Sequence, residues 1–419
     1  MTGRLAPQPW MTAAETRAVL DALTAEGGEV RFVGGCVRDA VLGRPVGDVD
    51  IATHDPPERV IALLERAGLK AVPTGIAHGT VTAVVGGKHF EITTLRRDVE
   101  TFGRRARVEF TDDWAADAAR RDLTMNALFC GPDGALYDPF GGLADLRAGR
   151  VRFVGDAAAR IREDVLRLLR FFRFHAHYGR PPPDPEALAA AKALAPLLPT
   201  LSGERVCGET FKLLRAPDPA SVFELMAGEG VLAHFLPEAA NLARLGALVA
   251  IEAAVAGPDA LRRLAALLDG THASAAAVAT RLRLSNRERN RLVGLAAAPL
   301  LSPGLDPAAR RRLRYRLGAE RFHDLALLAW AEKRGQSPFP AADADAWRGL
   351  LAAADWTPPD FPVKGKDAVR LGVPIGPAVG RLVAAVEAWW VAEDFRPDRK
   401  ACLQKLRELA ADDPPPSRG

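Results

Sequence analysis

The two acidic residues at positions 48 and 50 are the first feature of the sequence that could do chemistry. Alternate residues of a β-strand point to the same face, so Asp48 and Asp50 would bring two carboxylates together between apolar Val49 and Ile51. Two like charges side by side are costly without a cation, and carboxylate oxygens suit a hard divalent ion. The pattern favours a Mg²⁺ site, where metal ions can activate a hydroxyl and stabilise a leaving pyrophosphate. The alternative is a hairpin edge with two solvated aspartates.

A third carboxylate is expected on a neighbouring strand. Glu91 alternates with apolar Phe90 and Ile92 and is the candidate for a third catalytic carboxylate beside Asp48 and Asp50. Any half-buried strand shows the same alternation, so a solvent-facing Glu91 is the alternative.

Two glycines separate a short apolar run from a helix that carries an arginine in its first turn. Gly34 and Gly35 follow Val33, and Arg38 follows three residues later. This arrangement can present backbone N–H groups and a guanidinium to a phosphate, which makes these residues candidates for nucleotide binding. Taken alone, the glycines are equally typical of a tight strand-to-helix turn.

The segment from 120 to 126 combines two arginines, an acid, a hydroxyl and an amide. We expect a clamp in which Arg121 binds triphosphate oxygens while Asp122 and Asn126 hold the loop or the sugar. A helix end with a capping residue is the alternative, and it would account for Asp122 alone.

Four charged residues recur at intervals of three, namely Asp164, Arg167, Arg170 and Arg173, which predicts one polar face of a helix. A solvated stripe is the default interpretation. A sharper one follows from the Watson–Crick edges of the bases, because cytosine and adenine both place an amino donor beside a ring-nitrogen acceptor. Asp164 could accept from the amino group while Arg167 donates to the ring nitrogen, so one pair would take C or A and reject U and G. Arg170 and Arg173 would then face phosphate.

The elements that must position these residues change character along the chain. From 30 to about 153, β-branched runs alternate with turns, which predicts strands over 30–33, 48–52, 80–85, 89–95 and 127–130 and helices over 12–23, 38–42 and 57–67. From 157 onward, Ala, Leu and Arg recur at helical spacing between Pro-containing breaks. We therefore expect an α+β fold, a small mixed sheet with helices followed by an all-helical C-terminal half.

Composition limits the classes of protein to which the chain can belong. It has 419 residues, 48% hydrophobic and 26% charged, which is enough apolar material for more than one core. No apolar run reaches the roughly 18 residues that a membrane span needs, and residues 1–10 lack a secretory pattern, so we expect a cytoplasmic protein. The four cysteines are far apart, which predicts neither a zinc site nor a disulfide framework. The net charge of +4 permits a polyanionic partner without requiring one.

The order of the motifs GG-x-VRD, DxD, RRDxTxNA, DPxGG and EDxxR resembles that of the class II tRNA nucleotidyltransferases, and bacterial poly(A) polymerases share these signatures. The match covers the N-terminal half, and weaker likeness continues over 204–238 and 363–395. Leu123 replaces the aromatic residue that is common in the RRD motif. The resemblance implies a polymerase-β-like head with Asp48 and Asp50 as metal ligands. It also implies nucleotide contacts at the matching motif positions Gly35, Arg38, Arg121, Asp164, Arg167, Arg170 and Arg173.

The resemblance also sets the expected domains and activity. The expected domains are a catalytic head over 1–150, a helical neck with the base-reading helix over 151–215, and an RNA-binding body and tail over 216–350 and 351–419. The expected activity is template-independent addition of CCA to the 3′ end of tRNA from CTP and ATP, with Mg²⁺ as cofactor. A poly(A) polymerase, an enzyme adding only A or only C, and a non-catalytic RNA-binding protein are the alternatives. His323-Asp324 alone is a weak indication of a metal phosphohydrolase.

Overall fold

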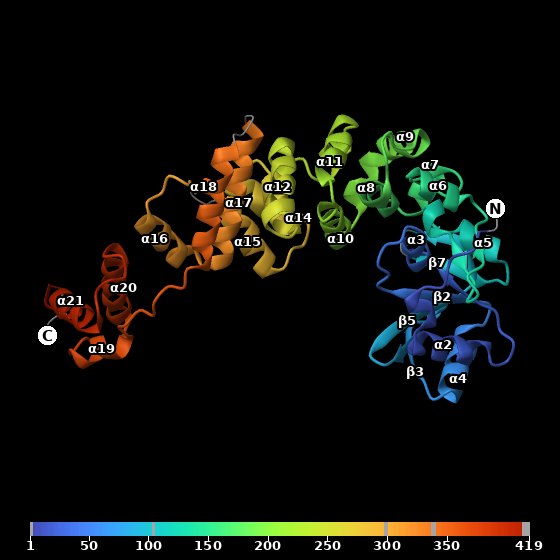
Figure 1. The fold of residues 1–419 in the computed structure, drawn as a ribbon, viewed down its shortest axis with the longest axis horizontal. Helices are drawn as coiled ribbons and strands as arrows, with labels where there is room; N and C mark the ends of the chain where they lie inside the picture. Colours follow the sequence, from blue (N-terminus) through green and yellow to red (C-terminus); the bar gives the residue numbers. More distant parts are fainter. Residues whose placement is uncertain (1–2, 103–104, 297–300, 337–340, 413–419) are drawn as a thin grey trace. The chain divides into compact units, whose positions relative to one another are not determined.

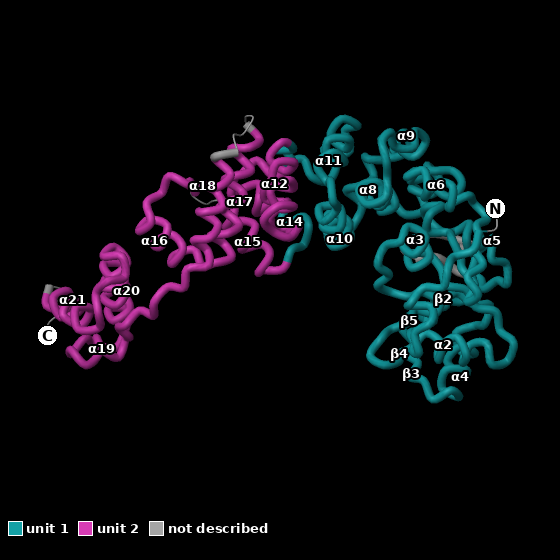
Figure 2. The backbone as a smooth tube through the Cα atoms, viewed as in Figure 1, with its two compact units in different colours: residues 1–242, 278–284 teal, residues 243–277, 285–419 magenta. Residues whose placement is uncertain are grey.

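The computed structural model describes residues 3–102, 105–296, 301–336 and 341–412. They form two compact units, of which the first contains Met1–Leu242 with Val278–Leu284 and the second contains Ala243–Ala277 with Ser285–Gly419 (Figure 2). Each unit is described by itself. The finer division at 150, 215 and 350 stays a prediction.

A mixed sheet is the framework of the first unit (Figure 1). Its seven strands follow the order β3-β4-β5-β2-β1-β8-β9, and β6 and β7 form a separate pair. Only β2 and β5 run parallel among the described pairs of the main sheet, and this places Asp50 directly opposite Glu91. The strands are β1 Val30–Val33, β2 Val49–Thr53, β3 Lys70–Gly75, β4 Thr80–Val85, β5 Lys88–Thr94, β6 Arg96–Phe102, β7 Arg105–Phe110, β8 Phe129–Cys130 and β9 Leu136–Tyr137.

The predicted strand positions agree with the observed strands to within two residues, and four more strands are present. Strand β2 begins at Val49, so Asp48 lies just before it rather than within it. The pattern over β6 and β7 gave no prediction because these segments are rich in charged residues and lack the apolar alternation of a half-buried strand. Strand β3 contains Pro73, which counts against a strand in a sequence pattern.

Helices pack on this sheet and supply its core. Helices α2 and α4 contact strands β1, β3, β4 and β5, and Trp114 and Ala118 of α5 join a buried cluster with Val33 and Phe129. The helices of this region are α1 Pro9–Thr12, α2 Ala14–Thr24, α3 Gly35–Val41, α4 Pro57–Arg66, α5 Trp114–Ala119 and α6 Gly142–Ala148. Leu123 is fully buried, so the position of the missing aromatic residue is still a core position.

The polar face expected over 164–173 does not lie on one helix, and this part of the prediction is wrong. Helix α7 ends at Glu163, Asp164 has an extended backbone, and α8 begins at Leu166. The break has a local cause, because Oδ1 of Asp164 accepts a hydrogen bond from the Leu166 N–H at 3.2 Å and so satisfies a donor at the start of α8. The neighbouring helices of the first unit are α7 Ala157–Glu163, α8 Leu166–Tyr178, α9 Pro185–Leu194, α10 Gly203–Leu214 and α11 Pro219–Gly228.

The chain is helical from α7 to the end of its described part, which together with the sheet of the head confirms the expected α+β fold. The remaining helices are α12 Leu242–Val255, α13 Ala260–Leu267, α14 His272–Arg281, α15 Asn286–Ala296, α16 Pro307–Leu317, α17 Ala319–Gln336, α18 Ala341–Ala352, α19 Gly365–Arg370, α20 Pro377–Ala392 and α21 Arg399–Asp412. Short 3₁₀ turns lie at Ile76–His78, Thr124–Asn126, Ala195–Thr200, Leu232–His234 and Ala353–Asp355. Across the described residues, every helix is too short or too polar to cross a membrane.

A buried ionic network lies in the core of the second unit. Arg262 of α13 contacts Glu252 at 2.6 Å and Asp324 of α17 at 2.9 Å, and Asp324 also pairs with Arg291 of α15 at 2.7 Å. Asp324 is 1% exposed, so it requires these partners. The His323-Asp324 dipeptide is therefore explained by helix packing.

Candidate active site

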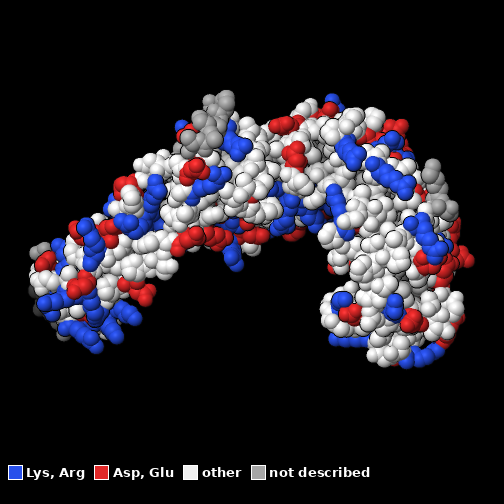
Figure 3. All heavy atoms as spheres, in the orientation of Figure 1, with Lys and Arg blue, Asp and Glu red and all other residues white. Residues whose placement is uncertain are grey.

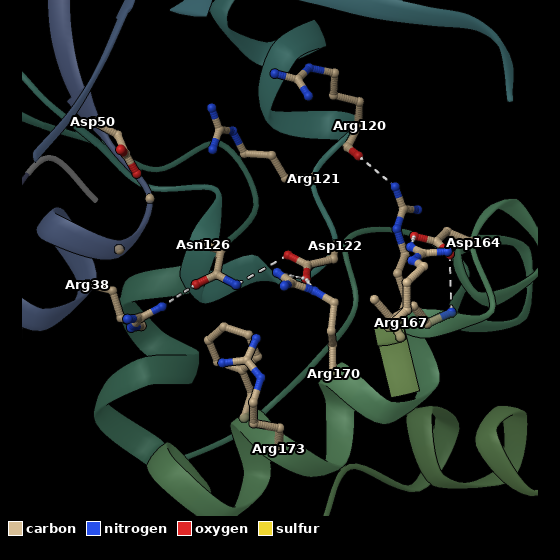
Figure 4. Close-up of a pocket in the computed structure, with 15 residues that line it drawn as sticks. Arg38, Asp50, Arg120, Arg121, Asp122, Asn126, Asp164, Arg167, Arg170 and Arg173 are labelled. Carbon is tan, nitrogen blue, oxygen red and sulfur yellow. Dashed lines mark hydrogen bonds and ion pairs between the residues drawn. The ribbon is translucent and has the colours of Figure 1, made fainter. Parts of the chain in front are cut away.

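A cavity of about 470 Å³ lies in the first unit where the sheet, the glycine turn and helix α8 meet (Figure 4). Eleven of the thirteen predicted site residues line it, and Asp48 and Glu91 are the two that do not. Its lining also contains residues that the sequence had not singled out. The lining residues are Gly34, Gly35, Arg38, Asp50, Arg120, Arg121, Asp122, Asn126, Asp164, Leu166, Arg167, Arg170, Arg173, Phe174 and Arg205. With seven arginines against three aspartates, the cavity suits a multiply charged anion of nucleotide size.

The glycine turn forms one wall of the cavity. Gly34 follows β1 with a φ of 73°, a left-handed conformation that favours glycine. Its N–H donates to the Leu128 carbonyl oxygen at 3.0 Å, and a Cβ added here would lie 3.5 Å from Nη1 of Arg121. Glycine therefore lets the backbone approach the arginine side of the cavity closely.

Arg38 is held on three sides at the base of this wall. Its Nε and Nη2 donate to the two carboxylate oxygens of Asp39 at 3.0 and 2.8 Å, and its Nη1 donates to Oδ1 of Asn126 at 2.7 Å. The residue is 8% exposed. The guanidinium is thus fixed before any ligand binds.

A buried chain of hydrogen bonds continues from Asn126 to helix α8 (Figure 4). Asn126 Nδ2 donates to Oδ1 of Asp122 at 3.2 Å, and Nε of Arg170 donates to Oδ2 of Asp122 at 2.6 Å. Burial raises the pKa of Asp122, but Arg170 and the Asn126 hydrogen bond outweigh it and hold that pKa below its ordinary value. Asp122 and Asn126 therefore brace the arginines, which agrees with a role in holding the loop.

A second buried carboxylate, which the sequence analysis missed, holds the two adjacent arginines of the RRD motif. Asp117 of α5 accepts from Nε of Arg120 at 2.8 Å and from Nη2 of Arg121 at 3.0 Å. Its pKa is lowered because these two cations outweigh the effect of its burial. Asp117 lies among alanines in the sequence, four residues before Arg121, and this i,i+4 spacing was the available signal.

Of the three carboxylates expected at the metal site, Asp48 lies just before β2, Asp50 lies on β2 and Glu91 lies on β5. Asp50 is half-buried on β2 and lines the cavity, whereas Asp48 and Glu91 are exposed. Burial raises the pKa of Asp50 to about 6, and the Glu91 carboxylate adds to the rise while Arg121 opposes it. An ionised Asp50 in this setting needs a cation.

The donor set fits a hard divalent ion that would also be coordinated by a ligand's phosphates. Within the part of the chain that the structure describes, no three His, Cys, Asp or Glu side chains are placed to hold a metal by themselves. Mg²⁺ is commonly bound by one or two carboxylates together with substrate phosphates and water, which is what Asp48 and Asp50 can supply.

Asp164 and Arg167, which the sequence analysis expects to read the base, both line the cavity, and different partners hold each side chain. Oδ2 of Asp164 accepts from Nη2 of Arg205 of α10 at 2.6 Å. Arg167 donates to Oε2 of Glu163 at 2.5 Å and to the Arg120 carbonyl oxygen at 3.3 Å. Both side chains line the cavity, so each can still offer a hydrogen bond to a ligand.

Arg173 is anchored to the neighbouring helix. Its Nε donates to Oε2 of Glu209 of α10 at 2.5 Å, and its guanidinium lies 4.1 Å from the Phe174 ring centre. Sequence reasoning missed Glu209 and Arg205. The signal for Glu209 was a carboxylate on the apolar side of a helix, where burial requires a partner.

Two family models match the chain. The Poly A polymerase head domain matches residues 30–152, and the probable RNA and SrmB-binding site of polymerase A matches residues 183–242. The first match contains the glycine turn, the two aspartates and the arginine motif.

Individual relatives match over most or about half of the chain. The mitochondrial CCA tRNA nucleotidyltransferase 1 of Danio rerio is 34% identical over 395 residues, which is 91% of this chain and 87% of the relative. The CCA-adding enzyme of Geobacillus stearothermophilus is 41% identical over 223 residues, which is 52% of this chain and 54% of the relative. The solved structure of the Bacillus stearothermophilus CCA-adding enzyme in complex with CTP has a TM-score of 0.77 at 29% identity, and the alignment covers 97% of this chain and 99% of that one.

Proposed function

Because the chain belongs to the class II CCA-adding family of tRNA nucleotidyltransferases, we propose that it adds C, C and A to the 3′ end of tRNA from CTP and ATP, releasing pyrophosphate. The observation that carries the proposal is the cavity, in which a strand carboxylate, an arginine clamp and an Asp–Arg pair meet. These are the groups needed to bind a triphosphate, recognise a base and prepare a hydroxyl for attack.

The proposed roles follow from the positions of the side chains. Arg38 and Arg121 bind triphosphate oxygens, and their fixed guanidinium groups neutralise the charge that develops on the leaving pyrophosphate. Asp48 and Asp50 would hold the divalent metal expected of a nucleotidyltransferase, which we propose to be Mg²⁺. Such an ion lowers the pKa of a bound hydroxyl and stabilises phosphoryl charge. Glu91, opposite Asp50 on β5, is proposed as a further carboxylate of this catalytic group.

Base choice is assigned to Asp164 and Arg167. The carboxylate of Asp164 has lone pairs beyond those that face Arg205 and Leu166, so it can accept from the amino group of C or A. Arg167 has donors beyond those used on Glu163 and the Arg120 carbonyl oxygen and can reach a ring nitrogen. Uracil and guanine would place a carbonyl opposite the carboxylate and leave it without a donor.

The helices of the C-terminal half are proposed to bind RNA through its backbone. Within the second unit, Lys and Arg side chains gather over helices α19 to α21 on the face shown in Figure 3. The exposed residues of these helices include Lys366, Arg370, Lys400 and Arg407. Phosphate contacts of this kind release counterions, so we expect tRNA binding to weaken steeply with added salt.

The structure disfavours two of the alternatives but does not separate the enzymes of the same family. A poly(A), A-only or C-only enzyme of the same family would use the same cavity, so the product must distinguish them. A non-catalytic RNA-binding protein would not need the half-buried Asp50, which lies opposite Glu91 and whose pKa is raised by burial and by that carboxylate. A phosphohydrolase at His323-Asp324 is disfavoured because Asp324 is paired with two arginines.

We propose a cytoplasmic location for the protein. None of its four cysteines, all of which lie in the described part, forms a disulfide, which agrees with a reducing compartment. The Danio rerio relative is named as mitochondrial, so fractionation of cells that make the protein is the direct check.

The test is extension of a tRNA transcript that lacks its 3′ CCA, with each nucleoside triphosphate alone and with CTP plus ATP in Mg²⁺. The expected product has C, C and A and stops there, and UTP and GTP are not incorporated. The variant Asp50→Asn and an excess of EDTA should each end incorporation. Long A tails on unstructured RNA would support the poly(A) alternative, and no incorporation by the wild type would refute the proposal.

A further inference from the structure

Tyr178, the last residue of helix α8, packs against two guanidinium groups from the head. Its ring centre lies 4.4 Å from Cζ of Arg38 and 4.5 Å from Cζ of Arg44. Its hydroxyl donates to Oδ1 of Asp39 at 3.0 Å. The side chain thus contacts Arg38 directly through its face and indirectly through its hydroxyl.

Asp39 transmits the second contact. The oxygen that accepts from Tyr178 also accepts from Nε of Arg38, and the other oxygen accepts from Nη2 of Arg38. Fixing this carboxylate therefore fixes the plane of the guanidinium. A planar fork of donors needs such orientation, because it recognises phosphate through two parallel hydrogen bonds.

The docking of α8 against the head has a further anchor beside this one. Nη2 of Arg44 donates to the His177 carbonyl oxygen at 2.9 Å. The end of α8 is therefore held by residues of α3 and the loop that follows it. Arg167, at the start of the same helix, lies roughly 16 Å from Tyr178 along the helix axis.

Tyr178 is not among the side chains that line the cavity, in the part of the chain that the structure describes, whereas Arg38 is. The Tyr178 ring also stacks on Phe174, which lines the cavity, with 5.7 Å between the ring centres. The hydroxyl and the cation–π contact of Tyr178, however, both lead to Arg38. We propose that Tyr178 is a positioning residue, which orients Arg38 for the triphosphate and sets it at a fixed distance from the base-reading end of α8. This inference rests on the proposed function, in which Arg38 binds triphosphate oxygens.

The test compares Tyr178→Phe and Tyr178→Leu with the wild type in single-nucleotide extension. Removal of the ring and the hydroxyl in Tyr178→Leu should raise KM for CTP and for ATP by about tenfold, and Tyr178→Phe should raise it by about threefold. The two nucleotides should be affected equally, and rejection of UTP should not change, because the base contacts are untouched.

Inhibition constants separate orientation of Arg38 from general loosening of the site. Inorganic tripolyphosphate reports on the arginines, and CMP reports largely on the base pocket. In Tyr178→Leu, the Ki of tripolyphosphate should rise about tenfold while that of CMP stays within about twofold. An equal rise in both would overturn the proposal in favour of a structural role.

A matched control and a double-mutant cycle complete the experiment. Tyr137 is also half-buried, and its ring centre lies 4.8 Å from Cζ of Arg31. Because Arg31 does not line the cavity, Tyr137→Leu should leave both Ki values unchanged. In an Arg38→Gln background, Tyr178→Leu should have no further effect on the tripolyphosphate Ki. An undiminished effect there would refute action through Arg38.

The outcomes also distinguish this inference from the proposed function. If the wild type fails to extend tRNA, the proposed function is wrong, and calorimetric binding of tripolyphosphate still tests the effect of Tyr178 on Arg38. If the wild type is active and both Tyr178 variants keep wild-type KM and Ki values, the inference alone is wrong.

Discussion

Replacing Asp122 by alanine should destabilise the first unit, because this carboxylate connects the arginine motif to helix α8. It accepts hydrogen bonds from the Leu123 N–H at 2.8 Å, from Asn126 Nδ2 and from Arg170. Alanine would leave all three donors without this acceptor. The side chain of Asp122 is 9% exposed, so little water can take its place.

The size of the effect follows from what remains after the substitution. Removing one partner of a buried ion pair costs about 3–5 kcal/mol. The Arg170 side chain is 30% exposed and can be partly hydrated, which reduces the expected loss to about 2–4 kcal/mol. Asp122→Asn keeps the shape and one acceptor, so its loss should be about half as large.

The loss should depend on pH in a defined direction. The pKa of Asp122 is lower in the folded protein than in the unfolded chain, where an aspartate has a pKa of about 3.9. Its stabilising contribution is therefore complete above that value and disappears as the pH falls through the folded pKa. The difference between wild type and Asp122→Ala should be constant from pH 5 to 7 and shrink below about pH 4.

Hydrogen exchange followed by mass spectrometry is the suitable assay, because the two units need not unfold together. Peptides covering 114–130 and 166–178 should exchange faster in Asp122→Ala, and peptides of the second unit should not change. Glu109→Ala is the matched control, since it removes an exposed partner of Arg97 on the same unit and should have little effect. Wild-type exchange in both peptides of Asp122→Ala would refute the argument.

Three further substitutions have distinct expected outcomes. Asp50→Asn should end incorporation. It should also raise the thermal midpoint of the metal-free protein, because it removes a half-buried carboxylate that faces Glu91, and a lowered midpoint would contradict this. Arg205→Met should weaken discrimination between CTP and UTP by roughly tenfold in kcat/KM, since Asp164 loses its partner; unchanged discrimination would show that Arg205 does not orient Asp164. Asp324→Ala should cost about 3–5 kcal/mol in urea unfolding of the second unit, and a loss below 1 kcal/mol would mean that its two arginines find other partners.

Most of the residues that line the cavity could be predicted from the sequence, because the chemistry expected of a site depends on residue type. A glycine with positive φ, a carboxylate beside a strand and an arginine after a turn each leave a local pattern in the chain. Eleven predicted residues line one cavity even though they come from segments up to 139 positions apart, from Gly34 to Arg173.

The supporting side of the site was largely missed, and the reason is physical. Arg205 and Glu209 of α10 pair with Asp164 and Arg173, which are far from them in the chain, and a single sequence does not reveal such contacts. Asp117 was missed although its i,i+4 spacing to Arg121 is local, because that spacing is common on exposed helices. The helix break at Asp164 was missed for a related reason, since periodicity treats a capping aspartate and a helical one alike. The charged hairpin β6–β7 lacks the apolar alternation that predicts strands.

The pairing of the cavity arginines explains how so many cations can share one site. Each of the seven has a carboxylate partner, namely Asp39 for Arg38, Asp117 for Arg120 and Arg121, Glu163 for Arg167, Asp122 for Arg170, Glu209 for Arg173 and Asp164 for Arg205. A guanidinium has five donors, so one or two bonds to a carboxylate leave others for phosphate. The carboxylates hold the side chains in place and reduce the mutual repulsion, and a bound triphosphate then meets donors that need little reorganisation. Loss of a supporting carboxylate should therefore weaken nucleotide binding even though positive charge is gained, the opposite of what net charge alone predicts.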